Sequence, residues 1–196
     1  VTIIFAAYAV GVVAGLFLLG HVSDWMGRRR MLVIAVLISA LSAVLFMVFT
    51  DVAGLLVARV VNGVSIGVLT ATATAHLGEL RARARPDENA IVAASVAGGA
   101  NLGGLALGPL VGGLFADFLP DPLHLPHTVF AVVLILLAIA IALVPETVDP
   151  RPRKYRPQKV AVPAASRGRF VAAAFAAFAG FALFGLFTSL APSILV

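Results

Sequence analysis

The chain of 196 residues contains no cysteine and few charged residues. Without cysteine, it has no disulfide, no thiol nucleophile and no thiolate metal ligand. Asp, Glu, Lys and Arg make up only 12% of the residues, about half of what soluble domains carry, while hydrophobic residues make up 61%. The mean hydropathy is +1.08. These shortages exclude an ordinary water-soluble domain and indicate an integral membrane protein.

Charge is missing altogether from long stretches of the chain. Residues 2–20 and 31–49 contain no Asp, Glu, Lys or Arg. Each is long enough to cross a bilayer as an α-helix, which takes about 20 apolar residues. Because the apolar runs have helix length rather than strand length, we predict an all-α, polytopic membrane fold. Six spans are expected, at roughly 2–20, 31–49, 52–77, 90–117, 128–144 and 170–196.

Basic residues collect in alternate connections between these spans. Apart from Arg59, every Lys and Arg lies in one of three connections, 21–30, 78–89 and 145–169, and the other two connections have none. Since Lys and Arg gather in cytoplasmic loops, these three connections should be cytoplasmic and Val1 should lie outside. The same topology explains the net charge of +5, so we expect no nucleic-acid partner.

The first basic connection is a tight turn between two spans. It reads Gly20-His-Val-Ser-Asp24-Trp-Met-Gly27-Arg28-Arg29-Arg30-Met-Leu32. The set Gly20, Asp24, Gly27, Arg28 and Arg29 resembles the loop between the second and third helices of the major facilitator superfamily. Val22 and Trp25 depart from the family's usual leucine and basic residue. A generic positive-inside loop is the alternative interpretation.

The resemblance implies a gate at the cytoplasmic end of the helices. Glu79 ends the third predicted span, close to where the turn with Asp24 and Arg28 is expected. We expect these three side chains to form one charge cluster that steadies the outward-open state.

Arg59 is the only charged residue well within a predicted span. An arginine near the bilayer centre costs about 2.5–3.5 kcal/mol on insertion scales, so such a charge is a functional candidate. With Asn62 and Gly63 it resembles the superfamily's fourth-helix motif, although glutamine is usual at the position of Asn62. The resemblance implies a role in proton coupling beside the central cavity. The alternative is an arginine that snorkels to the outer interface.

The fourth predicted span is rich in glycine. Gly104, Gly108 and Gly112 recur every four residues on one face, and Pro109 is expected to bend the helix. Together with Gly113, this pattern resembles the fifth-helix motif of proton-coupled antiporters in the superfamily. Generic small-residue packing is the alternative.

The resemblance covers essentially the whole chain and implies three parts. Residues 1–144 would form helices two to six of an N-terminal bundle, 145–169 a cytoplasmic central linker, and 170–196 the first helix of a C-terminal bundle. The larger fold would have twelve or fourteen helices. Because Val1 and Val196 lie inside apolar runs, we expect a fragment cut at both ends.

The function implied is secondary active transport by alternating access, most simply proton-coupled efflux of drug-like or amphipathic molecules. An uptake symporter or a sugar or metabolite exporter of the same superfamily is the nearest alternative. A polytopic membrane enzyme or receptor is disfavoured, because no Ser-His, Cys-His or metalloprotease arrangement is present.

The expected surroundings follow from this interpretation. Partners should be a small-molecule substrate, protons and the lipid bilayer, with the full-length protein acting as a monomer in the bacterial cytoplasmic membrane. No cofactor and no enzymatic activity are expected. His124 and His127 are too isolated to form a metal site. All nine acidic residues lie at span ends or in connections, so a proton-carrying carboxylate is expected outside this chain.

The topology can be tested because the chain has no cysteine of its own. With single cysteines at Arg83 and Leu123, an impermeant thiol reagent on intact cells should label only the Leu123→Cys protein. Labelling of Arg83→Cys without Leu123→Cys would reverse the orientation.

Overall fold

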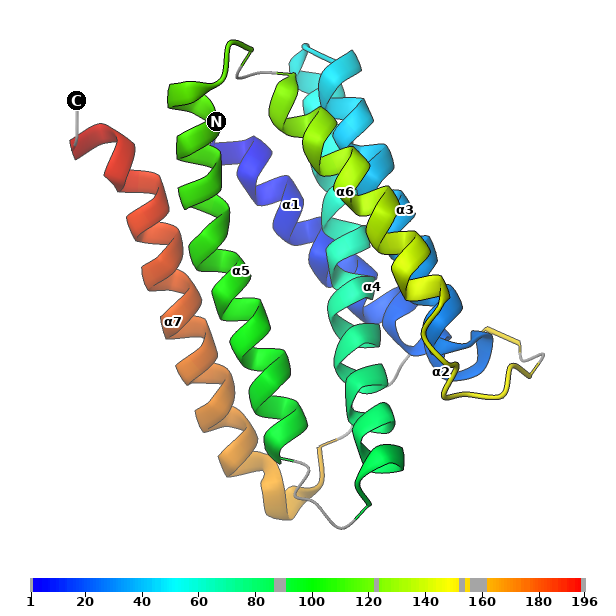
Figure 1. Ribbon diagram of the computed structural model, residues 1–196. Helices are drawn as coiled ribbons and strands as arrows, with labels where there is room; N and C mark the ends of the chain where they lie inside the picture. The colour runs from blue at the N-terminus through cyan, green and yellow to red at the C-terminus, as the bar shows by residue number, and fades with distance from the viewer. Residues whose placement is uncertain (1, 87–90, 122–123, 152–153, 156–161, 195–196) are drawn as a thin grey trace. The chain divides into compact units, whose positions relative to one another are not determined.

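The computed structural model describes residues 2–86, 91–121, 124–151, 154–155 and 162–194. Leu123, one of the two labelling positions above, lies outside the described residues. The chain forms two units, residues 1–158 and 159–196. The first contains helices α1 to α6 (Figure 1), and the second contains a short 3-10 turn, Ala164–Ser166, followed by α7, Arg167–Ile194.

Five helical segments in the described residues are long and apolar enough to cross a membrane. They are Ala6–Met26, Arg28–Val48, Val52–Ala84, Ile91–Phe118 and Leu125–Ala142. This confirms the predicted all-α, polytopic membrane fold. The sixth predicted span, 170–196, falls on α7, except that residues 195–196 lie outside the described part.

The first span is a helical rod of changing pitch. It runs from α1 (Thr2–Ala14) through a π-helical turn (Gly15–Leu19) and a 3-10 turn (Gly20–Val22) into α2 (Ser23–Met26). The rod stops at Gly27, whose φ of 105° lies in the left-handed region that glycine tolerates best. α3, Arg28–Val48, starts at once. The three arginines therefore form the first turn of a helix, not the loop that we predicted.

α4 is longer than the sequence led us to expect. It runs from Val52 to Ala84, and the Asp51 side chain caps its start by accepting from the backbone N–H of Gly54. We predicted an end at residue 77, which was wrong. The following residues are good helix formers, and the helix ends only where Pro86 forces Arg85 out of the helical region.

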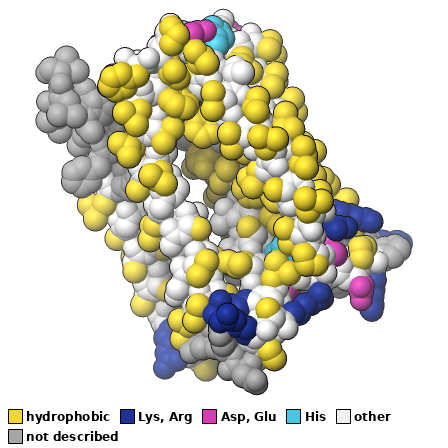
Figure 2. Space-filling view, viewed as in Figure 1, with side chains coloured by type: hydrophobic (Ala, Val, Ile, Leu, Met, Phe, Trp, Pro, Cys, Tyr) yellow, Lys and Arg dark blue, Asp and Glu magenta, His cyan; other side chains and the backbone are white. Residues whose placement is uncertain are grey.

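The remaining helices of the first unit build a bundle around α4. α6, Leu125–Ala142, packs along α3, and α3 packs along α4 (Figure 1). α5, Ile91–Phe118, contacts α4 and remains one helix through Pro109. Apart from Arg59, the Lys and Arg side chains described in this unit lie at one end, as Figure 2 shows, with hydrophobic side chains along the helices. We call this the basic end, formed by residues 21–30, 78–86, 143–151 and 154–155.

Glycines allow the closest contact in the bundle, where α1 crosses α4. A Cβ atom added at Gly11, Gly15, Gly63 or Gly67 would lie closer than 3.0 Å to backbone atoms of the opposite helix. The two backbones therefore touch, as small-residue stripes in membrane helices allow. Gly63, which we expected beside the central cavity, is thus buried against α1.

We predict that Gly67→Ala destabilises the full-length protein by about 1–3 kcal/mol, since the new methyl group must push the α1 backbone away. Thermal unfolding in detergent measures this. Gly78→Ala, on the same helix, is the matched control because nothing lies within 4 Å of its added Cβ. That control should be neutral or slightly stabilising. Equal melting temperatures for both variants would contradict the close crossing.

Candidate functional site: a charge cluster at the basic end

Arg28, at the start of α3, is the centre of a network of charged side chains. Its Nη1 lies 2.5 Å from Oδ1 of Asp24 and 2.6 Å from Oγ of Ser23. Its Nε and Nη2 donate to Oε1 of Glu79 over 3.1 and 2.9 Å. The planar guanidinium fork thus ties α2 to α4. The structure brings together the three residues that we expected to meet.

Glu146, just after α6, binds the start of α3. Its Oε1 accepts from the backbone N–H of Arg28 over 2.8 Å, and its Oε2 accepts from that of Arg29 over 3.1 Å. A carboxylate at this place satisfies donors that a helix N-terminus leaves open and complements the helix dipole. Gly27 makes room for it, because a Cβ there would lie 2.6 Å from Oε2 of Glu146.

These bonds affect the acidity of Glu146. Burial by itself would raise its pKa, but backbone N–H groups of residues 148, 147, 28 and 29 hydrogen-bond the ionised form. They outweigh burial, so the pKa of Glu146 lies below its ordinary value. The carboxylate is therefore ionised at neutral pH.

Thr147 joins the network to α4. Its hydroxyl donates to Oε2 of Glu79. A hydroxyl has only one proton to donate, so the 2.9 Å contact with Nδ1 of His76 is a bond in which the imidazole N–H donates. Arg83 donates to the backbone carbonyls of Glu146 and Thr147. The segment after α6 is thereby fixed against α4.

Together these side chains form what we call the basic-end cluster: Ser23, Asp24, Arg28, His76, Glu79, Arg83, Glu146 and Thr147. It connects α2, α3, α4 and the segment after α6 through hydrogen bonds and ion pairs. The backbone N–H of Arg151 adds a 2.9 Å bond to the carbonyl of Trp25. The beginning of the predicted linker, 145–151, is therefore held in place.

Arg59 lies away from this cluster, in the first turns of α4. Its guanidinium carbon lies 5.1 Å from the centre of the Phe46 ring on α3, a cation–π contact. His127 of α6 stacks on the same ring at 5.3 Å. The Nε atom of Arg59 is buried, and no partner for it lies among the described residues. Asn62 is half-buried one turn further along α4.

The glycine motif of α5 is open to its surroundings. At Gly104, Gly108, Gly112 and Gly113 an added Cβ would have nothing within 4 Å among the described residues, and Pro109 is exposed. These glycines therefore differ in their contacts from those at the α1–α4 crossing, which have the same four-residue spacing in the sequence.

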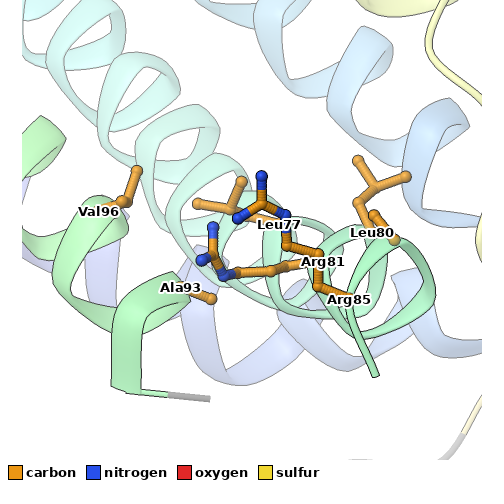
Figure 3. A pocket seen from close by; sticks show the side chains of 7 residues that line it. Leu77, Leu80, Arg81, Arg85, Ala93 and Val96 are labelled. Atoms are coloured by element: carbon orange, nitrogen blue, oxygen red, sulfur yellow. The ribbon is translucent and has the colours of Figure 1, made fainter. Parts of the chain in front are cut away.

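A hollow of about 280 Å³ lies where α5 meets α4 at the basic end. Arg81 of α4 and Arg85, the residue that follows α4, line this hollow together with Ala93 and Val96 of α5 (Figure 3).

Comparison with known proteins identifies the family of this chain. The model of the Major Facilitator Superfamily matches residues 1–196. The chain belongs to the Major Facilitator Superfamily. Members of this family are membrane transporters, and the five apolar helices fit a multi-pass membrane protein of that kind.

Two relatives of the chain are transporters. It is 33% identical over 162 residues to a triacylglyceride transporter of Mycolicibacterium hassiacum, covering 83% of this chain and 29% of that protein. It is 31% identical over 77 residues to an arabinose-proton symporter of Bacillus subtilis, covering 39% of this chain and 17% of that protein. The chain thus spans less than a third of the length of either relative.

Sequence reasoning missed five of the eight residues of the basic-end cluster. They are Ser23, His76, Arg83, Glu146 and Thr147, none of which was among the predicted site residues. The available signal was the Pro145-Glu146-Thr147 step directly after an apolar span. A carboxylate there reaches the same membrane face as the arginine turn, but the sequence does not say which helix start it meets.

We predict that Glu146→Gln lowers the stability of the full-length protein at pH 7 by about 1 kcal/mol, as for loss of a helix cap. A depressed pKa stabilises the fold above the unfolded-state pKa, near 4.5, and this contribution is lost as pH falls through the folded-state pKa. The melting temperatures of wild type and variant should therefore converge below about pH 4.5. Asp149→Asn, at an exposed neighbour, is the control. Curves that stay parallel for Glu146→Gln would contradict this account.

Proposed function

We propose that the full-length protein is a secondary active transporter that exports drug-like or amphipathic small molecules in exchange for protons. The basic-end cluster carries this proposal. It joins helix ends by ion pairs and hydrogen bonds, next to a small apolar cluster of Val22, Met31, Ala35 and Val68. The carboxylate partners of Arg28 remain partly exposed to solvent, so these contacts can exchange with water during an alternating-access cycle.

One of the two relatives supports an amphipathic class of substrate. The protein from Mycolicibacterium hassiacum is named for a triacylglyceride, and its similarity covers most of this chain. The resemblance of the α5 glycine motif to that of antiporters supports export. We further propose that the open face at Gly104, Gly108 and Gly112 receives a helix from outside this chain, because small residues let helix backbones approach closely.

Proton-driven uptake is the second candidate. It is favoured by the arabinose-proton symporter of Bacillus subtilis, although that similarity covers a smaller part of the chain. The two candidates differ in the direction of the pH gradient that drives transport, so one measurement separates them.

Arg59 is the residue that we propose for coupling. Its Nε is buried without a partner among the described residues, and a buried donor of this kind is expected to have one. A carboxylate from outside the chain would supply it. The permanent charge of the guanidinium would lower the pKa of that acid and favour its release of a proton.

We predict that Asp24→Asn reduces transport more than it reduces the amount of protein in the membrane. The amide removes the charge that pairs with Arg28, while Glu79 and Ser23 still hold the guanidinium. Transport rate divided by membrane abundance is the quantity to measure. Asp117→Asn, an exposed acid at the other end of the bundle, is the control. If both quantities fall equally for Asp24→Asn, the pair serves folding alone.

Proteoliposomes with a pH gradient test both the function and Arg59. An acidic lumen should drive accumulation of a fluorescent amphipathic cation by the wild type. Arg59→Ala and Arg59→Lys should abolish it and leave substrate counterflow intact, because lysine lacks the planar fork and can deprotonate when buried. Arg151→Ala, at an exposed arginine, is the control.

Three other outcomes decide against parts of the proposal. Accumulation driven by an acidic exterior would identify a symporter. Unchanged pH-driven accumulation in both Arg59 variants would leave Arg59 as an interface anchor. Accumulation that does not respond to pH in the wild type would exclude proton coupling.

A further inference from the structure

A second hollow at the basic end lies on the α3–α6 side of the bundle. Met26, Arg29, Arg30, Val33, Ile34 and Ala142 line it, and its volume is about 350 Å³. It does not belong to the basic-end cluster, because Arg29 and Arg30 contribute no side chain to that network. The side chains of Arg29 and Arg30 are therefore available for another partner.

The side chains of Arg29 and Arg30 line this hollow and make it positively charged. Arg29 is half-buried, and its Nη1 reaches the carbonyl oxygens of Ala142 and Val144 over 3.5 and 3.4 Å. Arg30 is exposed. In the part of the chain that the structure describes, no carboxylate lies within ion-pair distance of either guanidinium. The carbonyl contacts leave most of the guanidinium donors of Arg29 unused.

The hollow is lined by the first turns of α3 and the end of α6, two helices that pack side by side. Large hydrophobic side chains on these neighbouring helices are exposed, beginning with Ile34 in the hollow itself; they include Leu37 and Leu41 on α3, and Leu136 and Ile139 on α6. In a helix pair that crosses a membrane, such exposed side chains meet lipid chains. A positive site at the membrane surface thus continues directly into a surface suited to acyl chains.

We propose that this hollow binds an anionic glycerophospholipid, with the headgroup phosphate between Arg29 and Arg30 and the acyl chains along α3 and α6. Guanidinium groups bind phosphate oxygens through paired, charge-assisted hydrogen bonds. Basic pockets between membrane helices on the cytoplasmic side suit anionic headgroups. The apolar side chains of Met26, Val33 and Ile34 also line the hollow. A site for a free anion does not need apolar side chains, whereas a lipid would contact them.

Binding here would also affect the basic-end cluster. Arg29 contacts the carbonyl of Val144, two residues before Glu146, and its own backbone N–H donates to Glu146. A lipid phosphate that fixes Arg29 would steady the segment after α6 and hence the cap on α3. Anionic lipid is therefore expected to stabilise the closed basic end.

The test measures lipid binding, so it is independent of the transport proposal. Full-length protein is purified from bilayers that contain dioleoyl phosphatidylglycerol and dioleoyl phosphatidylcholine in equal amounts, and retained lipid is counted by native mass spectrometry. Wild type should retain phosphatidylglycerol and not phosphatidylcholine. Arg29→Gln/Arg30→Gln should bind phosphatidylglycerol about tenfold more weakly or worse, from the lost charge-assisted bonds.

Two matched variants separate the built site from general surface charge. Arg151→Gln/Lys154→Gln removes the same charge from exposed positions at the same end and should retain the lipid like the wild type. Arg29→Lys/Arg30→Lys keeps the charge and should bind with intermediate strength, since the fork is lost. It also remains informative if the glutamine variant fails to fold.

Three results would overturn the proposal. Equal lipid loss in the Arg151→Gln/Lys154→Gln control would reduce the effect to net charge. Full displacement of the lipid by inorganic phosphate would indicate a site for a free anion. Absence of retained phosphatidylglycerol on the wild type would mean that the hollow is not a lipid site.

Discussion

A largely buried guanidinium determines how the basic end is built. Arg28 leaves only 11% of its side chain exposed, so its charge and its donors must be satisfied by the protein. Asp24, Ser23 and Glu79 supply acceptors from both sides of the turn. Arg28 is also the first residue of α3, and its backbone N–H donates to Oε1 of Glu146. Satisfying this one group therefore fixes two helix ends and the segment after α6.

The sequence predicted which segments cross the membrane, but it did not predict where each helix ends. Apolar length alone predicted the crossing helices, because lipid demands about 20 uncharged residues whatever their partners. It says nothing about where a helix stops once it leaves the bilayer, which is why α4 continued past residue 77 to Ala84. Glu146 could not be assigned to Arg28, because 118 residues separate them and several helix starts share that face.

Glycine stripes show the same limit within the membrane. Gly63 and Gly67 on α4 meet the backbone of α1, while Gly104 and Gly108 on α5 face open space in the described residues. Their spacing is the same, since each stripe repeats every four residues. Spacing predicts that a helix can be approached closely, but only the arrangement of the bundle decides which stripe has a partner within this chain.

The two carboxylates that pair with Arg28 differ in their exposure to solvent. The side chain of Asp24 is 55% exposed and that of Glu79 only 33%. Water screens the Asp24 pair, so that contact contributes little and is easily exchanged. Glu79 also accepts hydrogen bonds from the hydroxyl of Thr147 and from two nitrogen atoms of Arg28. The pair with Glu79 is therefore stronger than the pair with Asp24. The strongest side-chain link of Arg28 is therefore the one that joins the start of α3 to α4.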